Sequence, residues 1–330
     1  MNGAIQDIPG ACSPVAGEFC DVSVLLPSDF VLDSGETLSR AELRLRLYGA
    51  LEKPVIAVAG GVSASRIVAD AEGEKGWWRD IVVRGGAIDL DRFCVLGFDF
   101  LPADNDTARA ISTADQARAL AAALTSLKIE KLFAFAGASY GGMVALAFAA
   151  VYPARVNHLC IVSAADKPHP AATALRGVQR RIIDFAQRVG EPEEGVRLAR
   201  QLAMISYRTP AEFEARFNYR PGANVGDPHE VCDYLIARGR AYPMSAERYL
   251  TLSDSVDRHC VDPTTIHADS LLIAVTSDQL APVGDMRRLA RALQTATLCE
   301  INSLYGHDAF LKEAAIIGPF IKSFLEDHLS

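Results

Sequence analysis

Five nearly continuous runs of apolar residues divide the chain. They lie at 54–59, 93–98, 131–136, 156–163 and 270–276. Runs of this kind, without polar alternation, are typical of strands that are buried on both faces, as in parallel sheets covered by helices. Patterns typical of helices lie between several of the runs, at 113–126, 141–151 and 285–294. Strands that alternate with helices predict an α/β fold with a mostly parallel, doubly wound sheet.

The amino-terminal part follows a different pattern. Leu43, Leu45 and Leu47 alternate with charged residues within 41–48, which is the period of two expected of a half-exposed strand. An earlier strand is predicted at 20–27, and turn-forming residues separate the two. We therefore predict an antiparallel hairpin ahead of the parallel sheet.

One long stretch interrupts the alternation of strands and helices. Between Pro168 and Asp262 the chain has no convincing buried strand. Amphipathic helical patterns fill this stretch instead, at 171–188, 193–207, 211–217, 229–240 and 245–257. The pattern predicts a helical lid at 167–262, inserted between the first part of the core at 1–166 and its last strands at 263–330.

Composition narrows the class of protein. The 330 residues are 50% hydrophobic and carry a formal net charge of −8, which suits a large core and argues against nucleic acid as a partner. No apolar stretch approaches the roughly 18 residues that span a bilayer. The first 19 residues contain neither a basic residue nor a long apolar run, so no signal peptide, no membrane partner and a cytoplasmic location are expected. Seven scattered cysteines without a CxxC pair predict reduced thiols.

The most informative motif is GASYG at 137–141, which has the G-x-S-x-G pattern. It follows the apolar run KLFAFA and opens the helical pattern that continues to 151. A sharp turn from strand to helix strains the serine backbone and exposes its hydroxyl, and glycines on either side allow close backbone approach. This context predicts Ser139 as a nucleophile; the alternative is a glycine-rich packing turn.

A serine nucleophile needs a base and an acid, which follow it in the order acid, then histidine, in this kind of fold. Asp278 comes directly after the apolar run at 270–276, and His307 follows a last short strand predicted at 297–301. Of the rival acids, Asp285 resembles a helix cap and Asp269 precedes the strand. We predict Ser139, Asp278 and His307 as a catalytic triad.

The negative charge that develops on a substrate oxygen needs two backbone N–H donors. Tyr140 directly follows the nucleophile and supplies one, and Gly61 in the loop 60–63 is the expected second. The sequence has no HExxH motif, no Walker A loop and no GxGxxG motif, so neither a metal nor a bound nucleotide cofactor is predicted.

These residues, taken with longer segments, resemble a known family. The most specific segments are GWWRDIVVRGGAIDLDRF, GASYGGMVAL, LARQLAMISYRTPAEFEARF, AERYLTLSDSVDRH and YGHDAFLKE. From about Pro54 onward the chain resembles the homoserine O-acyltransferases of the α/β-hydrolase superfamily, enzymes of methionine biosynthesis. The resemblance implies an α/β-hydrolase fold with the same triad. It also implies acyl-CoA and L-homoserine as small-molecule substrates, no permanently bound cofactor, and a homodimer.

The resemblance further implies that Arg200 and Asp308 bind homoserine. Homoserine is a zwitterion, so its carboxylate suits a guanidinium and its ammonium suits a carboxylate. From the sequence alone, the alternative for Arg200 is a charge on an exposed helix face, and the alternative for Asp308 is a loop cap.

The two candidate acyl donors differ in charge, because a succinyl group ends in a carboxylate and an acetyl group ends in a methyl group. The loop after 93–100 lacks the glycine-rich run that is usual in the family, and the chain looks most like the short branch that uses succinyl-CoA. A buried succinyl carboxylate needs a cation, yet Gln279 and Leu280 stand where that branch can carry a basic residue. Three arginines of the first lid helix are candidates instead, namely Arg176, Arg180 and Arg181. Acetyl-CoA as donor, serine as acceptor and water as acceptor (an esterase) remain alternatives.

Overall fold

The computed structural model describes residues 19–102, 107–218, 224–227 and 229–329. The amino-terminal segment for which no signal peptide is expected therefore lies outside the described residues, apart from Phe19. Within the described ranges, none of the helices combines the length and the apolar character that a bilayer-spanning segment needs.

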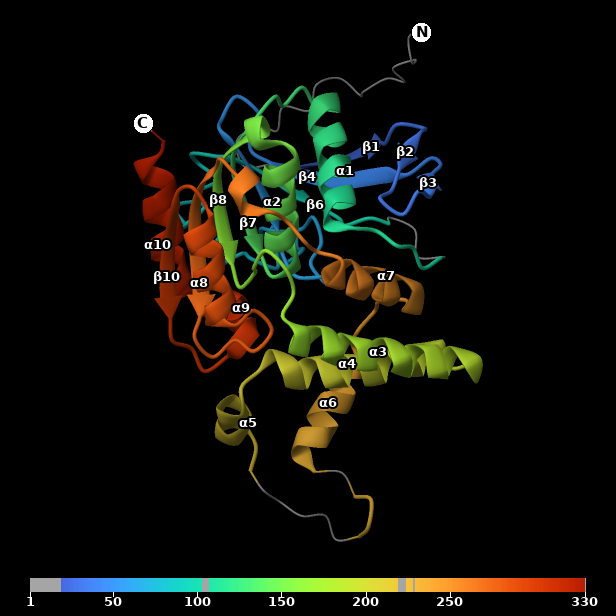
Figure 1. The fold of residues 1–330 in the computed structure, drawn as a ribbon. Coiled ribbons are helices and arrows are strands. Elements are labelled where there is room, and N and C mark those ends of the chain that lie inside the picture. Colours follow the sequence, from blue (N-terminus) through green and yellow to red (C-terminus); the bar gives the residue numbers. More distant parts are fainter. Residues whose placement is uncertain (1–18, 103–106, 219–223, 228, 330) are drawn as a thin grey trace.

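The core is an eight-stranded, mostly parallel sheet (Figure 1). Its strands, in spatial order, are β1 (Phe19–Leu25), β4 (Glu42–Tyr48), β6 (Cys94–Phe98), β5 (Val55–Ala59), β7 (Leu132–Ala138), β8 (Val156–Val162), β9 (Asp269–Val275) and β10 (Ala296–Ile301). β4 pairs antiparallel with β1 and β6, whereas all pairs from β6 to β10 are parallel. The predicted α/β class and the amino-terminal hairpin are confirmed. The link within that hairpin carries two further short strands, β2 (Phe30–Val31) and β3 (Thr37–Leu38).

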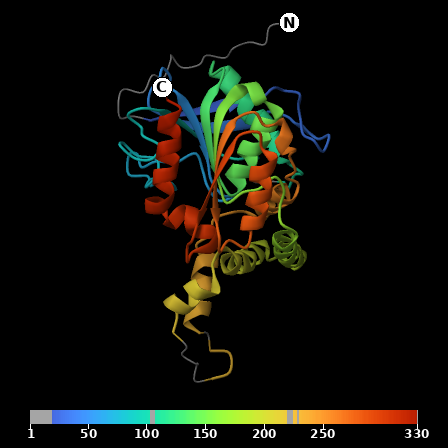
Figure 2. The ribbon, with the colours of Figure 1, turned by 60° about the vertical axis from the view of Figure 1, so that its left-hand side comes forward.

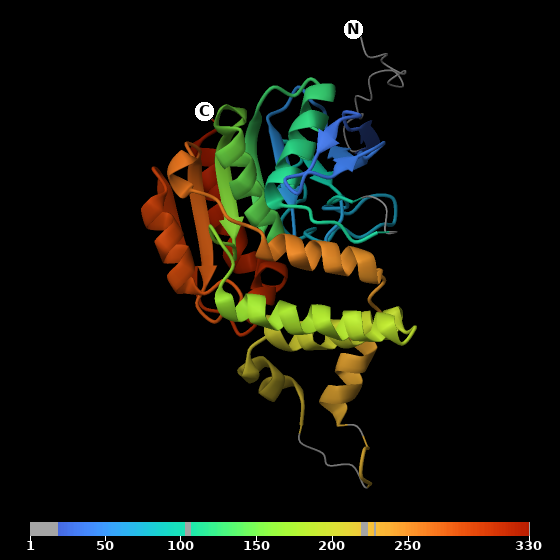
Figure 3. The same ribbon diagram turned by 45° about the vertical axis from the view of Figure 1, so that its right-hand side comes forward.

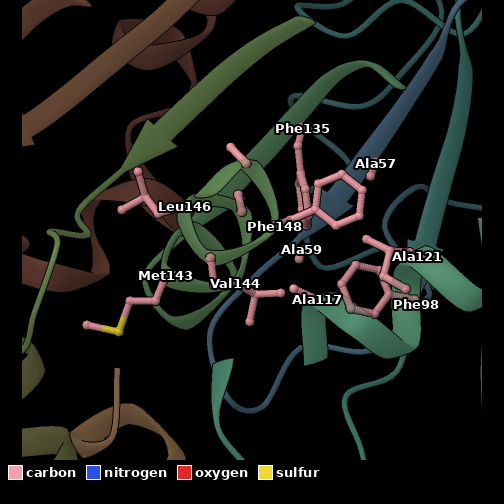
Figure 4. Packing of buried hydrophobic residues seen from close by; sticks show 14 of the residues in the cluster. Ala57, Ala59, Phe98, Ala117, Ala121, Phe135, Met143, Val144, Leu146 and Phe148 are labelled. Carbon is pink, nitrogen blue, oxygen red and sulfur yellow. The ribbon is translucent and has the colours of Figure 1, made fainter. Parts of the chain in front are cut away.

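Helices cover both faces of the sheet. α1 (Thr113–Ser126), α2 (Tyr140–Val151) and α8 (Val283–Ala292) pack on one face, and α10 (Ala314–Asp327) packs on the other. Figure 4 shows this packing around α2, where Phe148 meets Phe135 of β7 with ring centroids 5.9 Å apart. α2 is apolar all round and almost wholly buried, so the helix that follows Ser139 is held rigidly beneath it.

A second group of helices lies between β8 and β9 in the sequence. It comprises α3 (Pro170–Arg188), α4 (Pro192–Tyr207), α5 (Pro210–Arg216), α6 (Glu230–Arg240) and α7 (Ala246–Asp257). α3 and α4 lie side by side across the carboxyl end of the sheet, with α7 next to the core (Figures 1 and 3). α5 and α6 extend farthest from the sheet (Figure 2). The helices α3, α4 and α7 pack together around a small apolar core that includes Ile183, Val196 and Tyr249.

Short elements complete the fold. They are η1 (Pro153–Arg155), η2 (Pro263–Thr265), η3 (Gly306–Asp308) and α9 (Ala309–Lys312). The prediction of reduced thiols holds for the five free cysteines, namely Cys94, Cys160, Cys232, Cys260 and Cys299. It is wrong for Cys20, which is disulfide-bonded.

Candidate active site

Ser139 occupies a strained turn between β7 and α2. Its φ of 54° and ψ of −123° are unusual for a residue with a side chain, and such strain is found preferentially at functional sites. The neighbouring glycines make the turn possible. A Cβ atom at Gly137 would lie 2.5 Å from the Gly141 carbonyl oxygen, and one at Gly141 would overlap the Ala59 carbonyl. The G-x-S-x-G spacing is therefore a steric requirement of the turn.

A continuous chain of hydrogen bonds links the three residues of the predicted triad. The Ser139 hydroxyl lies 2.7 Å from His307 Nε2, and His307 Nδ1 lies 2.7 Å from Asp278 Oδ2. The other carboxylate oxygen of Asp278 accepts hydrogen bonds from the backbone N–H groups of Leu280 and Ala281, at 2.8 and 3.0 Å. With Asp278 fixed in this way, Nδ1–H of His307 donates to it and the lone pair of Nε2 is left to accept the hydroxyl proton.

The fold explains why these side chains meet. Ser139 follows β7, Asp278 follows β9 and His307 lies in η3 just after β10, so all three stand at the carboxyl ends of parallel strands. The rival acids lie elsewhere. Asp285 is in the first turn of α8, where it forms an ion pair with Arg288, and Asp269 begins β9 at the opposite edge of the sheet.

The electrostatic surroundings raise the pKa of His307 above its ordinary value. Burial by itself lowers the pKa, because it disfavours the charged imidazolium. The negative charge of Asp278 and its hydrogen bond act in the opposite direction, with a smaller contribution from Asp308, and together they outweigh burial. Arg176 opposes them weakly. The surroundings of His307 therefore favour its protonated form more than water does.

Two backbone N–H groups are available beside the Ser139 hydroxyl. Gly61 and Tyr140 both line the same cavity as Ser139, and neither N–H has a hydrogen-bond acceptor in the part of the chain that the structure describes. The Tyr140 side chain does not take part. Its buried hydroxyl lies 2.6 Å from the Ser255 hydroxyl, and burial raises its pKa to about 12, so the phenol stays neutral. This arrangement suits an oxyanion hole made only of backbone groups.

The cavity above Ser139 has a volume of about 220 Å³ and lies between the core and the lid helices. Three tyrosines supply much of its lid wall, Tyr207 from α4, Tyr242 from the segment before α7, and Tyr249 from α7. Tyr242 is tied to the core, because its hydroxyl lies 2.9 Å from that of Ser63. The sequence gives no signal for these tyrosines. Tyr207 and Tyr249 fall within amphipathic helical patterns, where they are indistinguishable from packing residues, and Tyr242 lies between two such patterns.

Arg200 and Asp308, predicted as ligands of the acceptor, both line this cavity. The Arg200 guanidinium lies 4.6 Å from the centroid of the Tyr242 ring and 5.3 Å from that of Tyr207. Among the described residues it has no carboxylate within ion-pair distance. Asp308 does have a partner, Arg208, whose Nε lies 3.2 Å from Oδ2. Arg208 is a neighbour that sequence analysis did not identify.

The structure distinguishes the three candidate arginines of α3, Arg176, Arg180 and Arg181. Arg176 lines the cavity, and its Nε donates to Asp257 Oδ1 at 2.8 Å. Arg180 donates to the other oxygen of the same carboxylate at 2.7 Å and does not line the cavity. Arg181 lies on the outer surface of the lid, in a hollow that it shares with Phe185. Two guanidinium groups therefore share one carboxylate, which leaves net positive charge beside the cavity.

Comparison with known proteins shows the family to which the chain belongs. A family model described as the alpha/beta hydrolase fold matches residues 71–314. The homoserine O-succinyltransferase of Xanthomonas campestris pv. campestris is 44% identical over 282 residues, which cover 82% of this chain and 76% of that protein. The homoserine O-acetyltransferase of Thermus thermophilus is 31% identical, covering 92% of this chain and 91% of that protein. The serine O-succinyltransferase of Litchfieldella anticariensis is 29% identical, and the match covers 77% of this chain and 83% of that protein.

Solved structures share the fold. The homoserine O-acetyltransferase from Bacillus anthracis has a TM-score of 0.86 at 19% identity, and the match covers 93% of this chain and 97% of that one. Esterase E22 has a TM-score of 0.85 at 22% identity, and the match covers 93% of this chain and 100% of that one. At such identities the likeness shows the fold and leaves the reaction to be argued from the site.

Proposed function

Because the chain belongs to the α/β-hydrolase-fold family and, within it, to the homoserine O-acyltransferases, we propose that it is a homoserine O-succinyltransferase of methionine biosynthesis. The observation that carries the proposal is one cavity that gathers a hydrogen-bonded serine and histidine, two free backbone N–H groups, and charged side chains suited to both substrates. The substrates are succinyl-CoA and L-homoserine, and no permanently bound cofactor takes part.

The first half of the reaction acylates Ser139. His307 Nε2 takes the hydroxyl proton as Oγ attacks the thioester carbonyl carbon, and the N–H groups of Gly61 and Tyr140 stabilise the oxyanion. When the intermediate collapses, the C–S bond breaks and the imidazolium returns its proton to the sulfur of CoA. The enzyme is left as a succinyl ester of Ser139.

The second half transfers the acyl group to homoserine. Arg200 holds the carboxylate of homoserine and Asp308 its ammonium, which places the side-chain hydroxyl at the acyl-serine. His307 takes the proton of that hydroxyl, the new ester bond forms, and the bond to Ser139 Oγ breaks as Oγ regains a proton from His307. The products leave one after the other, so the kinetics are ping-pong. The helices of 167–262 act as a lid that keeps water from the acyl-enzyme.

Arg176 supports succinyl-CoA over acetyl-CoA as the donor. Of the three candidate arginines on α3, Arg176 is the one that lines the cavity, and it is held in place by Asp257 and Thr173. A guanidinium fixed in this way can bind the terminal carboxylate of a succinyl group. We expect Arg176→Leu to lower kcat/KM for succinyl-CoA by about 10- to 100-fold, in line with the loss of one charged hydrogen-bond partner.

The same variant is expected to leave kcat/KM for acetyl-CoA nearly unchanged, because acetyl ends in a methyl group. Arg181→Leu is the matched control, since Arg181 stands on the same helix but outside the cavity. Steady-state kinetics with both donors would measure the effect. If kcat/KM falls equally with both donors, Arg176 contributes to the packing of the lid and does not bind the succinyl carboxylate.

The activity is also expected to depend on pH through His307. The base must be neutral to accept a proton, and its surroundings raise its pKa above the ordinary value of about 6.5. Below that raised pKa, kcat/KM for succinyl-CoA is therefore expected to fall about tenfold per pH unit. A pH–rate profile with thiol detection of CoA would measure this, and an acid limb centred well below pH 6 would contradict it.

The experiment that tests the proposed function is the release of free CoA from succinyl-CoA and acetyl-CoA, each with and without L-homoserine. Release that depends on homoserine and is faster with succinyl-CoA supports the proposal. Faster release with acetyl-CoA would make the protein an acetyltransferase. Release that requires L-serine in place of homoserine would change the acceptor, which differs by one methylene. Release that ignores both amino acids would make it a hydrolase.

A further inference from the structure

A second cluster of reactive side chains lies at the edge of the sheet opposite to Ser139. His158 is near the amino end of β8, Asp269 begins β9, and the two are partners in the parallel register. Residues of the same parity on these strands, including Cys160 and Leu271, pack with α10. His328 directly follows the end of α10, and its ring contacts both His158 and Asp269.

The three side chains converge. One ligand atom from each of His158, Asp269 and His328 lies within 4.8 Å of the others. The His158 and His328 rings are 4.4 Å apart between centroids. His328 Nδ1 lies 2.7 Å from the carbonyl oxygen of Phe324, so that nitrogen is the donor and Nε2 keeps its lone pair. A backbone carbonyl that fixes the second nitrogen of a histidine in this way is the usual support of a metal-binding imidazole.

The hydrogen bonding within the cluster is incomplete. His158 Nδ1 is buried and has no hydrogen-bond partner among the described residues. His328 Nε2 and Asp269 Oδ2 are 3.6 Å apart, which is too long for a good hydrogen bond. It is close to the roughly 3.3 Å that separates two ligands of one tetrahedral ion with bonds of about 2.0 to 2.1 Å. A shared cation would satisfy all three groups at once.

We propose that His158, Asp269 and His328 form a binding site for a divalent transition-metal ion of the zinc class. Two imidazoles and one carboxylate are ligands that suit Zn²⁺ and Co²⁺, with water in the remaining position. The side chains of His328 and Asp269 are 31% and 41% exposed, so an ion can enter from solvent. Because its ligands come from β8, β9 and the end of α10, the ion would fasten the carboxyl-terminal helix to the sheet. It lies away from the catalytic cavity and takes no part in acyl transfer.

The test is a titration of the metal-free, full-length protein with Co²⁺, followed by visible absorption. The expected result is a saturable band from one bound ion per chain. Asp269→Asn and His328→Ala are each expected to weaken Co²⁺ binding by at least about tenfold. His267→Ala is the matched control, because it removes an exposed histidine two residues before Asp269 and leaves the cluster intact; it should bind Co²⁺ as the unaltered protein does.

A second measurement separates the cation site from a merely structural cluster. Zn²⁺ is expected to raise the Tm of the unaltered protein and of His267→Ala, but not that of His328→Ala. Release of CoA by the variants shows that they are folded, since the catalytic cavity is distant. The proposal is overturned if Co²⁺ binds no more tightly to the unaltered protein than to Asp269→Asn and His328→Ala, or if Zn²⁺ shifts the Tm of all of them equally.

Discussion

Ser139→Ala is expected to lower acyl transfer by at least about 10⁴-fold, because among the described residues Ser139 carries the hydroxyl that is hydrogen-bonded to His307. The hydroxyl lies 2.7 Å from His307 Nε2 and next to the free N–H groups of Gly61 and Tyr140. Removing Oγ removes the covalent intermediate itself. The measurement is homoserine-dependent release of CoA from succinyl-CoA at saturating concentrations of both substrates.

A matched serine provides the control. Ser163 also lines the cavity, has a positive φ of 52°, and has a buried hydroxyl with no partner among the described residues. Ser163→Ala should lose less than about tenfold, because the Ser163 hydroxyl has no hydrogen bond to the triad among the described residues. Intact-mass spectrometry after mixing with succinyl-CoA should find a covalently bound succinyl group on the unaltered protein and none on Ser139→Ala. Near-normal turnover by Ser139→Ala would refute the proposed mechanism.

Arg200→Ala is expected to lower kcat/KM for homoserine by about 100- to 1000-fold. Truncating one partner of a buried, hydrogen-bonded charge pair costs about 2 to 5 kcal/mol. A 100- to 1000-fold fall in kcat/KM corresponds to about 3 to 4 kcal/mol, which lies in this range. The guanidinium lines the cavity beside two tyrosine rings, with no carboxylate of the described residues within ion-pair distance. Acylation of Ser139 by succinyl-CoA should continue, because homoserine enters only in the second half of the reaction.

The measurement therefore compares the rate of acylation of Ser139 with the rate of acyl transfer to homoserine. Rapid mixing with succinyl-CoA alone should give a normal burst of CoA, while turnover with homoserine is slow. Arg197→Ala is the control on the same helix, since Arg197 is exposed and pairs with Glu193 and Glu194. If Arg200→Ala keeps the unaltered kcat/KM for homoserine, the binding of the acceptor carboxylate has been assigned to the wrong residue.

Much of the site was accessible from local sequence patterns. The turn at 137–141 is set by sterics among neighbouring residues, so a five-residue motif between a strand and a helix is enough to find Ser139. Asp278 and His307 were found because parallel strands end at one edge of a sheet, and residues just after such ends converge there. Apolar runs and helical periods likewise predicted the order of most elements, including the helices α3 to α7 between β8 and β9, but α10 was not predicted.

The residues that sequence analysis missed or left open depend on long-range placement. Arg176, Arg180 and Arg181 lie within six positions of one helix, and their spacing alone does not say which of them faces the cavity. The disulfide at Cys20 also gave no signal, because cysteine spacing carries no information on which thiols lie within bonding distance.

The sequence by itself determined the α/β fold, the sharp turn at Ser139 and the convergence of Asp278 and His307 on it, because each depends on local sterics or on strand ends that any parallel sheet brings together. Only the tertiary structure decided which arginine of α3 lines the cavity, that three tyrosines wall it, and that His158, Asp269 and His328 converge. These outcomes depend on how helices rotate and dock against the sheet. Such docking is fixed by packing between residues far apart in the chain, and a single sequence carries no periodic or local signal of it.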